Sequence, residues 1–147
     1  MSPTCRNLGL SISIAVPAGV PVIRGNVGDR EVTDRLFADY DIDAVAHFAA
    51  SIVVPESVAD PLKYYLNNTV STARLIAACA NAAVRRFIFS STAAVYGNQN
   101  VSLLDEDVVC RPENPYGTSK LMSEQILRDA SKAYDLSYVA LRYFNVA

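Results

Sequence analysis

Short apolar runs of strand length alternate with longer segments of helical periodicity, and this alternation restricts the fold more than any other feature of the chain. Four runs are predicted to be strands: residues 20–25 (VPVIRG), 43–50 (DAVAHFAA), 85–91 (RRFIFSS) and 137–144 (SYVALRYF). Strands that are apolar on both faces and separated by amphipathic helices are typical of a parallel sheet. The sequence therefore predicts an α/β fold, a doubly wound parallel sheet with helices on both faces.

Three helices are predicted between these strands. Residues 31–40 carry apolar side chains at helical spacing. Asp60 and Pro61 supply an N-cap and a proline at the first helical position for a helix over 61–80, and Asn114 and Pro115 do the same for a helix over 116–134.

Composition excludes several classes of protein. The chain has 147 residues and a net charge of −2, with no basic cluster that would favour nucleic acid or an anionic membrane surface. No apolar run reaches the roughly 18 residues that a membrane span needs. The three cysteines at positions 5, 79 and 110 suggest neither a metal site nor a disulfide framework, and the N-terminus does not resemble a signal peptide. We expect a cytoplasmic protein with reduced thiols.

Tyr116 and Lys120 form the pair with the clearest chemical meaning. They are four residues apart at the start of a predicted helix, so their side chains lie on one face. A nearby ammonium group favours the phenolate, lowers the tyrosine pKa and allows the phenol to act as a general base. The spacing alone is weak evidence, since a surface Tyr/Lys pair has the same pattern.

Small and polar residues follow the predicted strands. They are found at 48–51 (FAAS), at 90–97 (SSTAAVYG) and at Asn145. In an open α/β sheet, ligands bind beyond the carboxyl ends of the strands. Turn formation alone explains such residues at a single strand end, but three endings together with the Tyr/Lys pair favour a binding site.

The chain resembles the extended short-chain dehydrogenase/reductase family of NAD-dependent epimerases and dehydratases, and within it the UDP-glucose 4-epimerases. The residues that carry the resemblance are DAVAHFAASIVVPESVADPLKYYLNNT, RRFIFSSTAAVYG, NPYGTSKLMSEQIL and LRYFN, in the family order. The resemblance implies NAD as cofactor and a UDP-hexose as substrate. It also implies a homodimer for proteins of full family length, and it implies neither a metal, nor nucleic acid, nor a membrane.

The resemblance also implies roles for individual residues. Tyr116 would take the proton from the sugar 4-hydroxyl. Lys120 would lower the pKa of Tyr116 and hydrogen-bond the nicotinamide ribose. Thr92 would bridge the sugar hydroxyl and Tyr116. Hydride would pass from sugar C4 to NAD and return to the other face of the 4-keto sugar. The implied cofactor-binding residues are Asn26, Val27, Phe48, Ala49, Ala50, Ser51, Ile52, Asn67, Thr92, Tyr116, Lys120, Tyr143 and Phe144. The implied substrate contacts are Thr92, Tyr116 and Asn145.

Ala93 and Ala94 favour epimerisation within that family. Related 4,6-dehydratases carry acidic residues just after the catalytic threonine, because elimination of water needs an additional acid and base, and alanine supplies neither. A sugar-nucleotide 4,6-dehydratase and a non-catalytic remnant are the alternative functions.

The glycine-rich loop of the family is absent from this sequence. The six glycines are at 9, 19, 25, 28, 97 and 117, and none opens a βαβ unit. We therefore expect residues 1–19 to be an unplaced segment and residues 20–147 to be a partial Rossmann-like NAD-binding domain that lacks the first βαβ unit and the C-terminal substrate domain. On this interpretation the isolated chain is a fragment without activity of its own.

Overall fold

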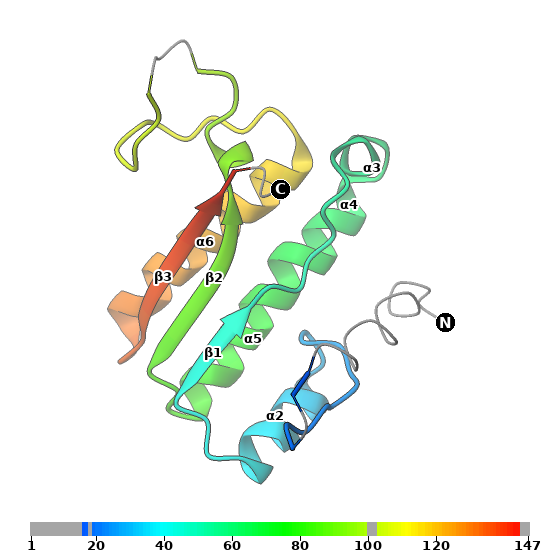
Figure 1. Cartoon of the computed structure of the whole chain (residues 1–147), viewed down its shortest axis with the longest axis vertical. Coiled ribbons are helices and arrows are strands. Elements are labelled where there is room, and N and C mark those ends of the chain that lie inside the picture. The colour runs from blue at the N-terminus through cyan, green and yellow to red at the C-terminus, as the bar shows by residue number, and fades with distance from the viewer. Residues whose placement is uncertain (1–15, 18, 100–102, 145–147) are drawn as a thin grey trace.

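The computed structural model describes residues 16–17, 19–99 and 103–144. Its sheet has three parallel strands in the order β1-β2-β3, formed by β1 (Ala44–His47), β2 (Arg86–Thr92) and β3 (Ser137–Tyr143). Figure 1 shows the strands side by side, with their carboxyl ends at one edge of the sheet. The predicted parallel α/β sheet is confirmed, and β1 is shorter than its apolar run.

The helical segments connect these strands in the predicted order. Helix α2 (Arg30–Asp39) precedes β1, and α6 (Pro115–Ala133) joins β2 to β3. Between β1 and β2 lie α3 (Val54–Ala59), α4 (Pro61–Tyr64), the π-helix η2 (Tyr65–Val70) and α5 (Ser71–Asn81). A short 3-10 turn, η3 (Ala93–Val95), follows β2. The sequence indicated neither α3 nor the π-helical turn.

The predicted caps of two helices are confirmed. The Asp60 carboxylate accepts a hydrogen bond from the Lys63 amide at 3.2 Å, and the Asn114 side chain accepts one from the Gly117 amide at 2.9 Å. Each cap satisfies an amide that has no partner within its helix, and the proline that follows needs none. These local signals fix where α4 and α6 begin.

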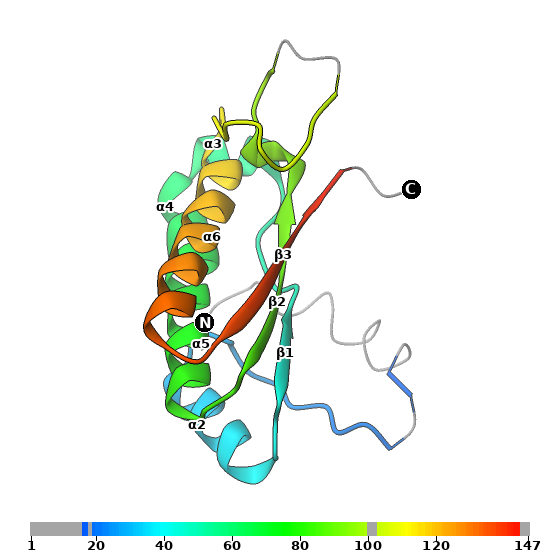
Figure 2. The same ribbon diagram turned by 90° about the vertical axis from the view of Figure 1, so that its left-hand side faces the viewer.

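The described helices α3, α4, α5 and α6 cover one face of the sheet only, as Figure 2 shows in side view. The prediction of helices on both faces does not hold for the described residues. Both crossovers, from β1 to β2 and from β2 to β3, run in the same direction across the sheet. Right-handed crossovers that run in one direction place all their helices on one side.

Side chains along β2 alternate accordingly. Phe87 and Phe89 are buried against the helices, whereas Ile88 points to the uncovered face and is 39% exposed. The main core lies between the sheet and helices α5 and α6 and consists of Leu75, Ile76, Cys79, Val84, Phe87, Phe89, Leu127, Ala130 and Leu136. This core fixes the angle at which α6 crosses the sheet.

The prediction of a strand over residues 20–25 is wrong. The segment has no strand pairing, and Val20, Val22 and Ile23 are all exposed. A strand needs a neighbour to accept and donate its backbone hydrogen bonds, and the segment finds none among the described residues.

Candidate active site

The first two turns of α6 carry the predicted base and its lysine. Tyr116 is half-buried in the first turn, and Lys120 is only 3% exposed one turn later. The Lys120 Nζ donates a hydrogen bond to the Ser90 carbonyl oxygen at 2.7 Å and lies 4.9 Å from the centre of the Phe89 ring. Burial lowers the pKa of Lys120 from 10.5 to about 8. The ammonium group is thus directed at the carboxyl end of β2.

Thr92 lies at that same end of β2, between two contacts with α6. Ser90, two residues before it, accepts the hydrogen bond from Lys120. Ala94, two residues after it, packs so closely on α6 that a Cβ at Gly117 would lie 2.7 Å from its carbonyl oxygen. The Thr92 hydroxyl accepts a hydrogen bond from the Ala94 amide at 3.2 Å, which shapes the turn. The structure therefore brings Thr92, Tyr116 and Lys120 to one edge of the sheet.

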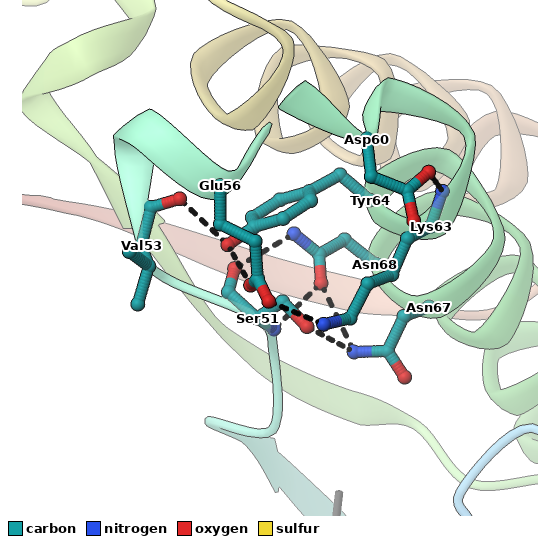
Figure 3. A network of polar contacts seen from close by, with 8 residues as sticks. All are labelled: Ser51, Val53, Glu56, Asp60, Lys63, Tyr64, Asn67 and Asn68. Carbon is teal, nitrogen blue, oxygen red and sulfur yellow. Dashed lines mark hydrogen bonds and ion pairs between the residues drawn. The ribbon is translucent and has the colours of Figure 1, made fainter. Parts of the chain in front are cut away.

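A buried tyrosine packs against Tyr116. The rings of Tyr64 and Tyr116 meet edge to face, with centroids 6.4 Å apart and planes at 84°. The Tyr64 hydroxyl is hydrogen-bonded to the Val53 carbonyl oxygen at 2.7 Å and to Glu56 Oε2 at 2.8 Å, and Glu56 pairs with Lys63 at 2.5 Å (Figure 3). Burial, reinforced by Glu56, raises the pKa of Tyr64 to about 12. Tyr64 therefore remains a neutral packing residue beside the predicted base.

From the sequence, we expect one ring of the adjacent pair Tyr64 and Tyr65 to be packed and the other to be exposed. Tyr64 is fully buried, as expected, while Tyr65 is half-buried rather than exposed.

Asn68 ties the loop after β1 to α6. Its Oδ1 accepts a hydrogen bond from the Ser51 amide at 2.8 Å, and its Nδ2 donates to the Ser51 carbonyl oxygen at 3.0 Å and to Ser119 Oγ at 3.1 Å. The neighbouring Asn67 donates to Ser51 Oγ at 3.0 Å (Figure 3). The side chains of both asparagines come from the π-helical turn, a feature that is frequent at functional sites.

The loop after β1 combines small residues with exposed apolar ones. Ala49, Ala50 and Ser51 leave the backbone accessible, while the flanking Phe48 and Ile52 are 59% and 66% exposed. Because Asn68 holds the loop backbone at Ser51, the loop presents a fixed apolar surface just after the carboxyl end of β1. Such a surface suits a flat, partly apolar ligand.

The remaining predicted contacts lie on either side of this loop. Asn26 is exposed, and its Oδ1 accepts a hydrogen bond from the Gly28 amide at 2.8 Å, while the half-buried Val27 packs against the main core. Tyr143 is the register partner of Thr92 on β3, and Phe144 follows it with an exposed ring. Asn145 lies outside the described residues.

His47 lies within an apolar run of the sequence, which favours a hydrogen-bonded core residue, and the structure has it in the core. It is buried, its Nε2 lies 2.9 Å from Thr72 Oγ1, and its pKa is lowered to about 4 by burial and then by the charge of Lys120. Next to a buried ammonium group, a neutral imidazole costs less free energy than a second positive charge would.

A hollow of about 440 Å³ lies along the outer edge of β3, away from Tyr116 and Lys120. Its lining includes Tyr96, Glu124, Arg128 and Arg142. The described part of the chain has no group of three or more His, Cys, Asp or Glu side chains able to hold a metal ion. Among its helices, none is both long and apolar enough to cross a membrane.

Comparisons with known proteins agree on one family. The model of the NAD dependent epimerase/dehydratase family matches residues 4–147. The UDP-glucose 4-epimerase of Azospirillum brasilense is 54% identical over 133 residues, which cover 90% of this chain and 38% of that protein. The chain thus spans about two fifths of the length of such relatives.

Solved structures show the same partial coverage. The UDP-Glc/GlcNAc 4-epimerase of Campylobacter jejuni is 46% identical, with a TM-score of 0.87 over 93% of this chain and 42% of the other. The UDP-glucose 4-epimerase of Bifidobacterium longum, solved with NAD+ and UDP, is 45% identical, with a TM-score of 0.82 over 86% and 39%.

Proposed function

This chain belongs to the NAD dependent epimerase/dehydratase family, and from that membership we propose that it supplies the proton-transfer residues of an NAD-dependent UDP-glucose 4-epimerase. The relatives and neighbouring structures named above carry that activity in their names. Because the chain spans about two fifths of their length, the proposal concerns the part of the reaction that residues 20–147 perform.

One observation carries the proposal. Helix α6 contacts β2 on both sides of Thr92, through Lys120 at Ser90 and through Gly117 at Ala94. On α6, Tyr116 directly precedes Gly117 and comes one turn before Lys120. A hydroxyl, a phenol and an ammonium group gathered at a strand end are the set that proton transfer to and from a sugar hydroxyl requires.

Each of the three residues has a distinct role. Tyr116 takes the proton from the 4-hydroxyl of the hexose and returns it at the end of the reaction. Lys120 supplies a buried positive charge one turn from Tyr116 on the same helix, and its hydrogen bond to Ser90 holds that charge in place. Thr92 orients the sugar hydroxyl toward Tyr116. The edge-to-face contact with Tyr64 restricts the tilt of the Tyr116 ring.

The residues present fit the nicotinamide half of NAD. The exposed apolar side chains of Phe48 and Ile52 flank small residues whose backbone is held by Asn68. When bound, NAD supplies the hydride acceptor. We propose that residues 48–52, Asn67, Lys120, Tyr143 and Phe144 hold its nicotinamide end, that Asn26 and Val27 lie beside its adenine, and that Asn145 contacts the phosphates of the nucleotide sugar.

The 4,6-dehydratase alternative finds less support. Elimination of water needs an acid and a base beside the threonine, and η3 offers two alanines there, Ala93 and Ala94. An experiment can test directly whether the chain is a non-catalytic remnant.

For this experiment we define the chimera as the A. brasilense relative in which the 133 matched residues are replaced by those of this chain. The chimera tests the proposed function. We expect it to interconvert UDP-glucose and UDP-galactose, as followed by chromatography of the nucleotide sugars. Formation of a 4-keto-6-deoxy sugar would favour the dehydratase. A folded chimera that retains NAD but converts neither sugar would favour the remnant.

We also propose that a protein of full family length forms a homodimer through the α4–η2 run and α6. Leu62, Leu66 and Val70 are exposed along that run, and Met122 is exposed on α6. A second copy would cover these apolar side chains. In analytical ultracentrifugation the chimera should sediment as a dimer and its Leu66→Glu variant as a monomer. A chimera that is already monomeric would exclude the dimer.

A further inference from the structure

Glu124 lies on the same stripe of α6 as the two predicted catalytic side chains. It follows Lys120 by four residues, just as Lys120 follows Tyr116, so each of the three side chains neighbours the next one turn along the helix. Glu124 is only 3% exposed. A carboxylate this deeply buried is stable only when charged or polar partners replace its lost hydration.

Two strands supply those partners. Arg142 on β3 donates from Nη2 to Glu124 Oε2 at 2.8 Å and from Nε to Oε1 at 3.1 Å, a bidentate pair. Ser91 on β2 donates its hydroxyl to Oε1. One carboxylate on α6 therefore contacts both the central strand β2 and the outer strand β3 of the described sheet.

The register of the strands gives these contacts their meaning. Ser91 and Arg142 are register partners, and the next pair is Thr92 and Tyr143. Glu124 thus binds Ser91 and Arg142, and the register pair that follows them consists of two predicted site residues, Thr92 and Tyr143. Arg142 also donates to the Tyr96 hydroxyl at 2.9 Å and lies over the Tyr96 ring, which fixes the far side of the turn after Thr92.

We propose that Glu124 is a positioning residue that sets the distance between the catalytic stripe of α6 and the strand ends carrying Thr92 and Tyr143. The inference rests on the proposed function, because it takes Thr92, Tyr116 and Lys120 as the reacting group. Glu124 itself touches neither substrate nor cofactor. It acts by fixing where the helix crosses the ends of two strands.

The charge-neutral variant Ser91→Ala tests this role in the chain itself, without NAD or activity. Loss of the Ser91 hydroxyl releases β2 from Glu124, so we expect Lys120 to become more hydrated. NMR of the lysine side chains should then show its titration midpoint rising by about half a unit or more from near pH 8, and the Thr92 methyl resonance should move. His47, which also faces Lys120, stays neutral in this range because its pKa is about 4.

The matched control is Ser131→Ala, which removes a serine hydroxyl from the exposed side of the same helix, where it bonds only the Arg128 carbonyl oxygen. Both signals should stay at their parent values in this control. Glu124→Gln is the second variant. Removing a negative charge by itself lowers a lysine pKa, so a rise of the Lys120 midpoint in Glu124→Gln reports rearrangement of the site.

The outcomes separate positioning from stability alone. A raised Lys120 midpoint and a shifted Thr92 resonance in both variants support positioning. Parent values of both signals, with only the free energy of unfolding reduced, would overturn it. A lowered midpoint in Glu124→Gln with no change in Ser91→Ala would also overturn it. The chimera assay decides separately whether the positioned group is catalytic.

Discussion

Asn68→Ala should destabilise the chain far more than the same change at its neighbour. Asn68 is 2% exposed and takes part in four hydrogen bonds: two with the Ser51 backbone, one to the Ser119 hydroxyl and a longer one of 3.4 Å from Asn67 Nδ2. Each such bond contributes about 0.5–1.5 kcal/mol net, and a buried group left without a partner costs more. Because Ser51 is half-buried and water can reach part of it, we expect a loss of roughly 3 kcal/mol.

Asn67→Ala is the matched control for this prediction. Asn67 occupies the same π-helical turn but is half-buried, and its best hydrogen bond is the 3.0 Å contact to Ser51 Oγ. We expect a loss of about 1 kcal/mol or less. The gain in helix propensity from asparagine to alanine is the same at both sites and cancels in the comparison.

Urea unfolding followed by circular dichroism measures both changes, with linear extrapolation to water. The difference between the two variants should be about 2 kcal/mol, with unchanged denaturant slopes. Equal losses, within about 0.5 kcal/mol, would refute the inference that Asn68 holds the loop after β1 to α6.

Three further predictions concern the same region. Burial lowers the pKa of Lys120 from 10.5 to about 8, so between these pH values the unfolded state binds more protons than the folded state. The free energy of unfolding should therefore rise with pH in this range, by up to roughly 3 kcal/mol. Urea titrations at several pH values should show that Lys120→Met loses this rise. Burial lowers the pKa of His47 from 6.5 to about 4, so the free energy of unfolding should drop by roughly 3 kcal/mol as the pH falls from 6.5 to about 4. His47→Gln should remove this dependence of stability on pH. Gly117→Ala places a Cβ 2.7 Å from the Ala94 carbonyl oxygen and should cost about 1–3 kcal/mol in the same assay, whereas an unchanged stability would show that α6 does not pack tightly on the turn after Thr92.

Local signals predicted the start of the site helix correctly. Asn114, Pro115 and the spacing of Tyr116 and Lys120 determine where α6 begins and which side chains share a face, and the structure agrees to one residue. The apolar run of β2 was also predicted to within a residue at each end. In both cases the information lies within a few consecutive residues.

Features that depend on distant parts of the chain were predicted poorly. A strand over 20–25 requires a partner, and no local pattern shows whether one is present. The sequence pattern predicted helices on both faces of the sheet, because apolar strands look alike whether one face or both is covered. The strand order determines how many faces are covered, because two right-handed crossovers in one direction place their helices on the same face of the sheet.

Two polar residues escaped sequence reasoning for a related reason. Asn68 was not singled out because a π-helical turn has no simple sequence signature, although two adjacent asparagines inside a helix are unfavourable and could have drawn attention. Glu124 was not singled out either. Its four-residue spacing from Lys120 was visible in the sequence, but its partners Ser91 and Arg142 come from other strands.

Turnover of the chimera carrying Tyr116→Phe tests the central claim most directly. Phenylalanine keeps the ring that packs on Tyr64 and removes only the hydroxyl that moves the proton. We predict that turnover of UDP-galactose falls by about 10²- to 10⁴-fold relative to the parent chimera, with UDP affinity in calorimetry unchanged within about twofold. Parent-level turnover in this variant would contradict the assignment of Tyr116 as the base and, with it, the proposed role of the whole group.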